Sequence, residues 1–596
     1  MSEILATYAP YIAIGVIVVT FVVIFFNVLR PAPAFLLAAL FLVVINILTP
    51  AEFLQGFSNP SLAAIVLLIL ITNGFRKNFN LEALFNRLMG TANTYRKFLL
   101  RMMAQVAFFS SFINNTPVVT FMVPYVFDWG KKRNISPSKL LIPLSFATIL
   151  GGMITIIGTS TTLVLNGFLA DFDYPGLVGH ELLIIGSIVT VSGILFFWSI
   201  GHKLLPDNRD LQDNFQENKQ EFLVETILQE DSALVGQSIH DADLRNLPGV
   251  YLAEILRDKR AISPVPPEEI LQTGDSLIFA GETNNIMELV NRQPGLSLPK
   301  VASRLAEHQN SQSAEVVVGN NSSMVGKRVK DTDFRNRYDA AIVAVNRGGE
   351  RLQGKIGDIR LSPGDVLLLL VGPAFQNQIE VFRDLILISA PSNWKRPNRR
   401  KTYALGLVVA VAVILLALGV FSLFTSLLII FGLMGFMQMI TIQDIKRELD
   451  VNLVVTLVMS LALGHAIAKT GAGTLLAEGL LSWLIPYGNL AVLIGILLIT
   501  TLLTSFVTNV AAVSITFPIA LSLAQSSGID PAPLFLAIAY GASAAFLTPI
   551  GYQTNLIVYG PGGYTFKDFL RAGFPITAIY LVLVTLGIML LYPSVF

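Results

Sequence analysis

The chain has 596 residues, of which 53% are hydrophobic and only 14% are charged, a balance that excludes an ordinary soluble protein. Its formal net charge is +1, so charge favours no nucleic-acid partner, and the absence of cysteine excludes disulfides, thiolate metal sites and cysteine nucleophiles. The composition therefore predicts an α-helical polytopic membrane protein.

Apolar segments of membrane-crossing length form two blocks, separated by a polar stretch of about two hundred residues. The predicted spans lie near 8–28, 33–49, 61–75, 140–171 and 182–201, and then near 402–418, 420–441, 452–468, 531–560 and 573–594. Two of them, 140–171 and 531–560, are longer than one crossing and contain polar residues, which predicts a break in each. We expect a first transmembrane repeat over 1–201, linkers at 202–219 and 389–401, and a second repeat over 402–596.

Two further apolar segments, about 102–128 and 488–520, are predicted to form re-entrant helical hairpins. Lys and Arg flank the first segment on both sides, so both of its ends are expected in the cytoplasm. Apart from Asp128 at the boundary of the first, neither segment contains Asp, Glu, Lys or Arg. An arm of half such a segment reaches roughly 20 Å, which places the tip near the bilayer centre. Non-helical backbone at that depth must be buried in protein or line a cavity.

The distribution of basic residues predicts the orientation. Loops rich in Lys and Arg alternate with basic-free loops, and no Lys or Arg occurs between Gly471 and Phe566. We expect the protein to lie in the plasma membrane, which is the inner membrane of a bacterium. Both termini are expected outside, and residues 202–401 are expected in the cytoplasm. Five crossings in each half is an odd number, so the two halves are predicted to be inverted relative to each other.

The polar segments themselves repeat between the halves. SFINNTPVVTFMVP at 111–124 aligns with SFVTNVAAVSITFP at 505–518, and IIGTSTTLVLNG at 156–167 aligns with PIGYQTNLIVYG at 549–560. Such glycine-broken polar segments at corresponding positions point to a transporter's binding site. Asn115 and Asn509 could instead serve only as interhelical hydrogen-bonding residues, but their paired positions favour binding. Neutral oxygens suit a hard cation such as sodium, helix N-termini suit an oxyanion, and a bound dianion would need co-bound cations.

The polar stretch between the halves is a tandem repeat with a spacing of 90 residues. Gly274-Asp275 matches Gly364-Asp365, and an apolar strand follows each pair. This pattern predicts two small α+β domains, at 220–295 and 313–388. Whether they bind a small regulatory ligand or only brace the structure stays open.

The motifs NNTP at 114–117, TN at 508–509, GTSTTLVLNG at 158–167 and TPIGYQTNLIVYGPGGY at 548–564 resemble the divalent anion/sodium symporter family, most closely its sulfate-transporting branch. The two inserted domains resemble the paired TrkA-C domains of that branch. The resemblance implies sodium-coupled sulfate import by an elevator-type mechanism, in a homodimer in contact with membrane lipid. It implies co-transported sodium ions, no organic cofactor and no enzymatic activity.

The resemblance also implies the site residues. One sodium site would use Ser110, Asn114, Asn115 and Gly158, and the other Thr504, Val507, Asn509 and Gly551. The substrate site would use Asn115, Thr116, Asn509 and Val510, together with Thr159 and Tyr552, which begin the polar runs that replace the family's proline-rich stretches. Val510 replaces a hydroxyl residue of the family pattern, which favours a compact oxyanion over a carboxylate.

Three alternatives remain at this stage. The same fold could carry a dicarboxylate, citrate, phosphate or an arsenite-like oxyanion. A ligand-gated channel is a second class, because TrkA-C-like domains also accompany potassium pathways, although no TVGYG-type filter is present. An intramembrane enzyme is the weakest, because the spans hold no nucleophile, carboxylate or metal constellation.

Overall fold

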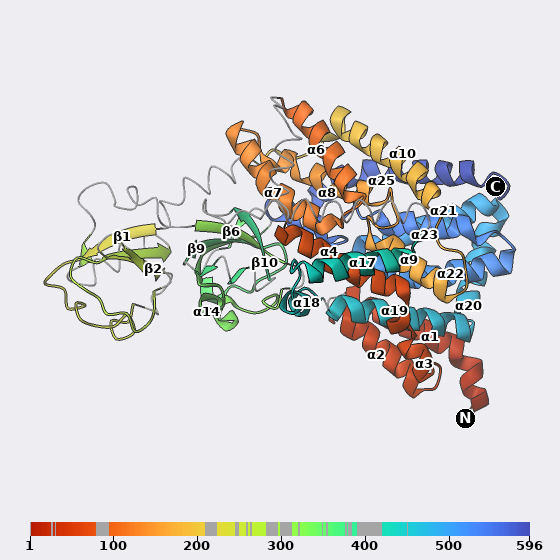
Figure 1. The fold of residues 1–596 in the computed structure, drawn as a ribbon, viewed down its shortest axis with the longest axis horizontal. Coiled ribbons are helices and arrows are strands. Elements are labelled where there is room, and N and C mark those ends of the chain that lie inside the picture. The colour runs from red at the N-terminus through yellow and green to blue at the C-terminus, as the bar shows by residue number, and fades with distance from the viewer. Residues whose placement is uncertain are drawn as a thin grey trace.

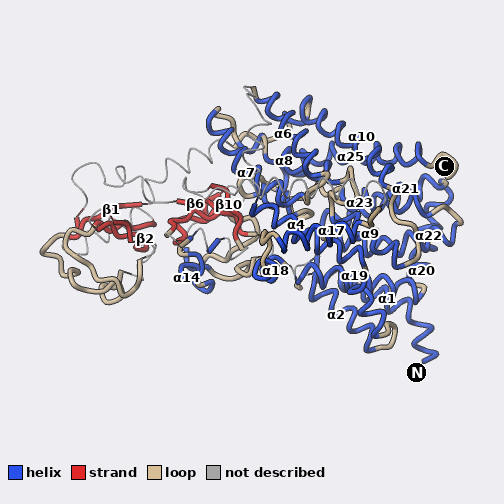
Figure 2. Tube along the Cα trace, viewed as in Figure 1, coloured by secondary structure: helices blue, strands red, loops and turns tan. Residues whose placement is uncertain are grey.

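The chain folds into a helical body and, beside it, two small antiparallel sheets (Figure 1; helices and strands are distinguished in Figure 2). Both chain ends lie at the end of the helical body farthest from the sheets (Figure 1). The computed structural model describes residues 2–25, 28–29, 31–78, 94–208, 223–244, 250–257, 260–262, 265–281, 296–297, 313–319, 322–347, 350–352, 356–372, 374–375, 378–379, 384–389, 420–449 and 451–596. The predicted span at 402–418 and most of the two predicted linkers lie outside these residues.

The first half of the helical body follows the apolar runs of the sequence. Its helices are α1 (Ser2–Phe25), α2 (Pro31–Val44), α3 (Pro50–Leu54), η1 (Gln55–Ser58), α4 (Pro60–Asn78), α6 (Tyr95–Ser110), α7 (Asn115–Lys132), η2 (Pro137–Lys139), α8 (Leu141–Gly152), α9 (Ser160–Asp171), α10 (Gly179–Ser199) and η3 (Gly201–Lys203). The predicted hairpin at 102–128 corresponds to α6 and α7. The predicted break in 140–171 falls between α8 and α9.

The second half repeats this order. Its helices are α17 (Leu423–Phe436), α18 (Ile442–Glu448), α19 (Val451–Thr470), α20 (Ala472–Leu484), η6 (Ile485–Tyr487), α21 (Asn489–Phe506), α22 (Asn509–Ser527), α23 (Pro531–Ser543), α24 (Gln553–Tyr559) and α25 (Phe566–Leu591). The predicted hairpin at 488–520 corresponds to α21 and α22, and the break in 531–560 lies between α23 and α24.

Two predicted spans are wrong at their C-terminal ends. The span expected at 33–49 ends at Val44, because Asn46 adopts a left-handed conformation with φ of 60°, and the span expected at 420–441 ends at Phe436, because Gln438 has φ of 55°. A short helix follows each turn, with a capping box formed by Thr49 and Glu52 in α3 and by Thr441 and Asp444 in α18. The helix α20 was not predicted at all.

Within the described residues, six helices are long and apolar enough to cross a membrane. A seventh crossing results if the bent pair Pro50–Ser58 and Pro60–Thr72 counts as one span. The helices Pro31–Val44, Leu423–Phe436 and Pro531–Ser543 are apolar but shorter. Four of the six belong to predicted spans, whereas Asn489–Phe506 and Asn509–Ser527 are the arms of the hairpin predicted at 488–520, and each is long enough to cross a membrane. Turns and breaks divide other predicted spans into shorter helices, and the span predicted at 402–418 lies outside the described residues.

The insert contains two five-stranded antiparallel sheets with the same topology. The first sheet unit consists of β1 (Leu223–Leu228), β2 (Val250–Arg257), β3 (Arg260–Ile262), β4 (Ser276–Gly281) and β5 (Leu296–Ser297), in the order β3-β2-β4-β1-β5. The second sheet unit consists of β6 (Ser313–Val318), β7 (Ala340–Arg347), β8 (Glu350–Arg351), β9 (Val366–Val371) and β10 (Leu385–Ser389), in the order β10-β6-β9-β7-β8, with the short helix α14 (Phe334–Tyr338) beside it. Each has its own apolar core.

Candidate functional site

Asn115 and Asn509 occupy the same position in the two hairpins. Each is the first residue of the second arm, α7 or α22, directly after the turn. Both are buried, with 1% of Asn115 and 6% of Asn509 exposed. The hydroxyl of Thr508 caps α22 by accepting a hydrogen bond from the Ala511 N–H at 3.3 Å. The first helical residue after each turn is thus buried in protein, while Phe112 and Phe506, next to the turns, are exposed.

A hydroxyl at the end of the first arm contacts each asparagine. Thr504 Oγ1 lies 2.8 Å from Asn509 Oδ1 and 2.7 Å from the Ala542 carbonyl oxygen. Ser110 Oγ has the equivalent partners, Asn115 Oδ1 and the Thr148 carbonyl oxygen, the latter at 2.9 Å. A hydroxyl carries one hydrogen for these two acceptors. Each hairpin end therefore has a surplus of neutral oxygen lone pairs, which favours a cation.

The two glycines of the broken spans lie against the same hairpin ends. A Cβ at Gly158 would lie 2.5 Å from the Gly152 oxygen and 2.8 Å from the Ser110 oxygen, and one at Gly551 would lie 2.8 Å from the Thr504 oxygen. Only glycine allows backbone carbonyls to approach this closely. Ser110 and Gly158 are therefore together at one hairpin end, and Thr504 and Gly551 at the other.

Thr155 and Thr548 fix the two breaks, and neither was among the predicted site residues. Their hydroxyls donate to the carbonyl oxygens of Ser111 and Ser505. They accept from the N–H groups of the glycines, Gly158 at 3.2 Å and Gly551 at 3.1 Å. A signal for them exists in the sequence, because a threonine stands three residues before the glycine in both repeats.

Hydrogen bonds connect each tip to the broken span of the opposite half. Asn115 Nδ2 donates to the Tyr552 hydroxyl at 2.8 Å, and Asn509 Nδ2 donates to Thr161 Oγ1 at 3.1 Å. The Tyr552 hydroxyl also interacts electrostatically with the side chain of Thr159, whose Oγ1 lies 3.2 Å from Thr161 Oγ1. A continuous chain of uncharged groups therefore runs from one asparagine to the other, and we call these five residues the cross-half network.

Thr116 and Gln553 extend this network at its more exposed edge. Thr116 Oγ1 donates to Gln553 Oε1 at 3.1 Å. Gln553 begins α24, whose position is fixed from within by Asn555. The Asn555 side chain accepts from Ser145 Oγ at 2.7 Å and donates to the Ala545 carbonyl oxygen at 2.6 Å. Gln553 and Asn555 belong to a polar run noted in the sequence, but their partners were not predictable from it.

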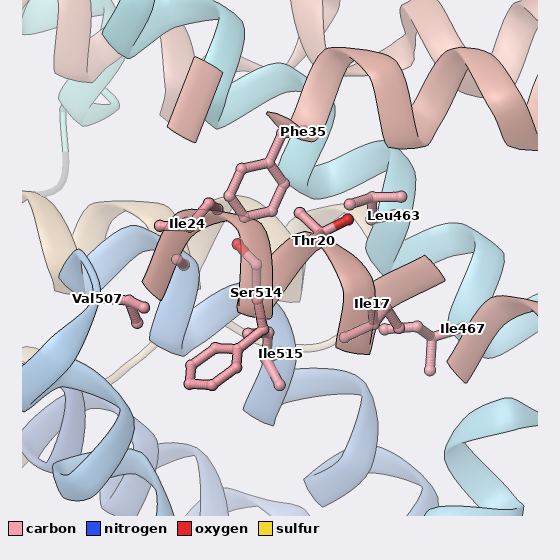
Figure 3. A pocket seen from close by; sticks show the side chains of 11 residues that line it. Ile17, Thr20, Ile24, Phe35, Leu463, Ile467, Val507, Ser514 and Ile515 are labelled. Atoms are coloured by element: carbon pink, nitrogen blue, oxygen red, sulfur yellow. The ribbon is translucent and has the colours of Figure 1, made fainter. Parts of the chain in front are cut away.

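The remaining predicted residues lie next to the network without a polar side-chain role that the structure displays. Asn114 is half-buried in the turn before α7, and Val510 is buried in the first turn of α22. The Val507 side chain lines an apolar pocket between α1, α2, α19 and α22, together with Ile17 and Phe35 (Figure 3). A role of Val507 in cation binding can therefore involve only its backbone carbonyl.

The citrate transporter family, CitMHS, matches two overlapping stretches of the chain, residues 20–513 and 413–596. The chain belongs to this citrate transporter family. Together with its apolar helices, this membership makes it a multi-pass membrane transporter. Within the part of the transporter that the structure describes, no three His, Cys, Asp or Glu side chains come together, and the oxygens gathered at the tips are neutral.

Three relatives illustrate the family. A Chlamydomonas reinhardtii protein described provisionally as a sulfur deprivation response regulator is 32% identical over 570 residues, 93% of this transporter and 97% of the relative. An uncharacterized transporter of Synechocystis is 30% identical over 607 residues, 99% of this transporter and 98% of the relative. Sodium/sulfate cotransporter 1 of Chlamydomonas reinhardtii is 30% identical over 392 residues, 61% of this transporter and 44% of the relative.

Proposed function

We propose that this transporter imports sulfate together with sodium ions, and that the cross-half network is the place where the anion binds. The proposal rests on one observation: the two polar atoms of each buried asparagine face partners in different halves of the chain. Asn115 and Asn509 direct Oδ1 toward the hydroxyl of their own hairpin and Nδ2 toward a hydroxyl of the opposite half. An amide oxygen binds a cation and an amide N–H binds an anion, so each asparagine can hold a sodium ion beside the anion.

The two sodium ions are assigned to the two hairpin ends. At the first, the oxygens of Ser110, Gly158 and Asn115 are the ligands, with Asn114 beside them in the turn. At the second, they come from Thr504, Val507, Asn509 and Gly551. Neutral oxygens of this kind suit a hard cation, which does not require a carboxylate.

The anion is assigned to the hydrogen-bond donors between the two tips. These are Nδ2 of both asparagines and the hydroxyls of Thr116, Thr159 and Tyr552, with Val510 as an apolar wall. No arginine or lysine occurs in 140–170, 488–520 or 531–560, so sodium must balance the charge of the anion. The coupling also supplies energy, about 1.4 kcal/mol for each tenfold sodium gradient and about 2.3 kcal/mol for each net positive charge moved through 100 mV.

Sulfate is the preferred anion for two reasons. A full-length relative is described by its role in sulfur deprivation, and others are sodium/sulfate cotransporters. In addition, Val510 removes a hydroxyl, which suits a compact oxyanion better than a long carboxylate. Citrate is the second candidate, because the matching family is described as citrate transporters.

We further propose an elevator-type movement with inverted halves and with residues 202–401 on the cytoplasmic side of the plasma membrane. The position of both termini at the end opposite the sheets supports this orientation (Figure 1). The crossed pairing of each tip with the opposite half's broken span supports the inverted relation.

Uptake of labelled sulfate into proteoliposomes, with and without an inward sodium gradient, tests the cargo and the coupling together. We expect uptake only with the gradient, and competition by unlabelled sulfate but not by equimolar citrate. Uptake that ignores the gradient would contradict the coupling. Sodium-driven uptake of labelled citrate with no sulfate uptake would make citrate the cargo.

Asn115→Ala and Asn509→Ala should each abolish sodium-driven uptake while the protein still folds, because each removes one amide that serves the cation and the anion. Asn59→Ala is the matched control. Asn59 is also a buried asparagine and donates to the Gly167 carbonyl oxygen at 2.9 Å, but it lies outside the network. If Asn59→Ala reduces uptake as strongly as the other two, loss of interhelical hydrogen bonds explains all three.

A further inference from the structure

The second sheet unit is in direct backbone contact with one end of α24. A Cβ at Gly560, which follows α24, would lie 2.1 Å from the Gly364 carbonyl oxygen and 3.1 Å from a Val366 methyl group. From the other side, a Cβ at Gly364 would contact Tyr559 at 3.6 Å. Val317, near the end of β6, and Val366, at the start of β9, pair with each other and belong to the apolar core of the helical body. The two parts of the chain thus meet through a contact that glycine alone permits.

The turn that carries Gly364 is held rigidly within its sheet. The Asp365 carboxylate is fully buried and accepts from Arg347 Nε at 2.7 Å and Nη2 at 2.8 Å. The same carboxylate accepts from the Ser362 N–H at 2.7 Å, and the Gly364 N–H donates to the Val318 oxygen at 2.9 Å. Because these hydrogen bonds keep the turn from deforming, a displacement of the second sheet unit moves the turn with it as a rigid body.

The first sheet unit has the same turn without the contact. Gly274 has φ of +82° and Gly364 has φ of +83°. Asp275 accepts from Arg257 Nε at 2.8 Å and Nη2 at 2.9 Å, as Asp365 does from Arg347. Nothing lies within 4 Å of the Cβ position at Gly274. The docking is thus specific to the second unit, and the first offers an internal control.

The other end of α24 carries two residues of the proposed anion site. Tyr552 precedes this helix and Gln553 is its first residue, and they bond to Asn115 and Thr116. Seven helical residues span only about 10 Å, so the docked end and the site end are neighbours. The loop after the helix is also held from the start of the insert, because Asn208 Nδ2 donates to the Gly563 carbonyl oxygen at 2.7 Å.

We propose that Gly364 and Gly560 are positioning residues for transport: through their contact, the second sheet unit sets α24 and thereby the Tyr552 hydroxyl and the Gln553 amide in the anion site. The assignment rests on the proposed function in so far as Tyr552 and Gln553 belong to that site. Loss of the contact should displace the donors on α24, while the packing of β10 on α7, a separate contact of the same sheet unit, stays in place. The KM for the anion should therefore change more than kcat.

Two variants break the contact from opposite sides. Gly560→Ala places a Cβ against the Gly364 carbonyl without straining its own backbone, since Gly560 has φ of −63°. Gly364→Asn keeps a residue that tolerates the left-handed conformation and adds a side chain against Tyr559. Gly274→Asn makes the same change in the equivalent turn of the first sheet unit, where the added Cβ meets no neighbour, and is the matched control. The first two should raise the KM for sulfate by about fivefold, and the control should not.

A second readout is independent of the cargo. The chain has no cysteine, so Gln553→Cys, at an exposed position, supplies a single thiol whose rate of reaction with a maleimide reports the position of α24. Gly560→Ala and Gly364→Asn should each change this rate by about threefold or more, and Gly274→Asn should leave it unchanged. An unchanged labelling rate in Gly560→Ala, or equal effects of the two Asn variants in both readouts, overturns the proposal. If the unmodified protein takes up no sulfate while the labelling rates still shift, sulfate as the cargo is contradicted and the positioning role is supported.

Discussion

Asn115 and Asn509 each present two different chemical groups to two different neighbours. Their Oδ1 atoms accept from a hydroxyl of the same half, and their Nδ2 atoms donate to a hydroxyl of the other half. A carboxylate at either position would lose the N–H donors, and an aliphatic side chain would lose both functions. The amide supplies an acceptor atom and a donor atom at these positions without carrying a charge.

Removal of the Tyr552 hydroxyl tests the proposed anion site with a single substitution. Tyr552→Phe keeps the ring and removes the hydroxyl that accepts from Asn115. Loss of one such hydrogen bond corresponds to about 1 kcal/mol, so the KM for the anion should rise about fivefold. Initial rates of uptake at varied sulfate concentration measure it.

Tyr540→Phe is the control for this substitution. Tyr540 is also buried, and its hydroxyl donates to the Leu182 carbonyl oxygen at 3.0 Å, away from the network. Its removal should lower thermal stability without changing the KM. Equal KM values for Tyr552→Phe and the unmodified protein would remove Tyr552 from the anion site.

At the residue scale, the sequence singles out those residues of the candidate site that repeat locally and does not indicate those brought in by tertiary contacts. The aligned tips and glycines were found because the same motif occurs twice. Thr148 and Ala542 were missed because they contribute only backbone carbonyls and lie 38 residues from their partners. Thr161 and Gln553 stood within predicted polar runs, but which asparagine each would approach depends on how the two halves pack.

At the scale of elements, each broken span is a pair of short helices, and the glycine at its break lies against backbone carbonyls of the break or of a hairpin. Gly158→Ala and Gly551→Ala place a methyl group among these carbonyls, 2.5 Å from the Gly152 oxygen in the first case and 2.8 Å from the Thr504 oxygen in the second. Because the carbonyls must move apart, each variant should lose sodium affinity by about tenfold or more. The sodium concentration for half-maximal uptake measures this.

Gly15→Ala, in α1, is the control for the glycine variants. Nothing lies within 4 Å of the Cβ position at Gly15. This change only improves helix propensity and should leave sodium dependence unaltered. Wild-type sodium dependence in Gly158→Ala and Gly551→Ala would contradict the assignment of the sodium sites.

Element boundaries were predictable where a polar break is repeated and not where a single residue ends a helix. The hairpins and the broken spans were found from hydropathy and repetition. The short helices α3 and α18 were not predicted, and the spans before them were placed too far toward the C-terminus, because the left-handed residues Asn46 and Gln438 are not distinctive in the sequence. The contact between Gly364 and Gly560 joins elements almost two hundred residues apart, and no local sequence pattern predicts it.

At the scale of the whole molecule, the two halves are interlocked at the site. The second arm of each hairpin packs on the broken span of the opposite half, α7 on α24 and α22 on α9. Polar contacts add a second connection away from the site: His465 Nε2 hydrogen-bonds to Asp171 Oδ2 at 2.5 Å, and Lys469 Nζ forms an ion pair with Glu52 Oε2 at 2.9 Å. Residues of both halves surround each hairpin tip, so we expect binding to require both halves.

The orientation of the whole molecule can be tested because the chain has no cysteine of its own. Residues near the C-terminus gather at one end of the helical body, where Tyr592 contacts Glu181 and Asn489 Nδ2 donates to the Val595 carbonyl oxygen at 2.8 Å. Val178→Cys and Tyr487→Cys, which lie beside these contacts at exposed positions, should therefore react with an impermeant maleimide applied to intact cells.

Lys132→Cys and Thr273→Cys report the opposite side. Both positions are exposed, one at the end of α7 and one in the first sheet unit, and both should react only after the cells are permeabilised. Reaction of all four cysteines after permeabilisation shows that each is accessible, so protection in intact cells reports the membrane alone. The reverse pattern would place the sheets outside, and because the hairpin ends and the crossed pairing would keep their geometry, it would invert the direction of transport without changing the proposed site.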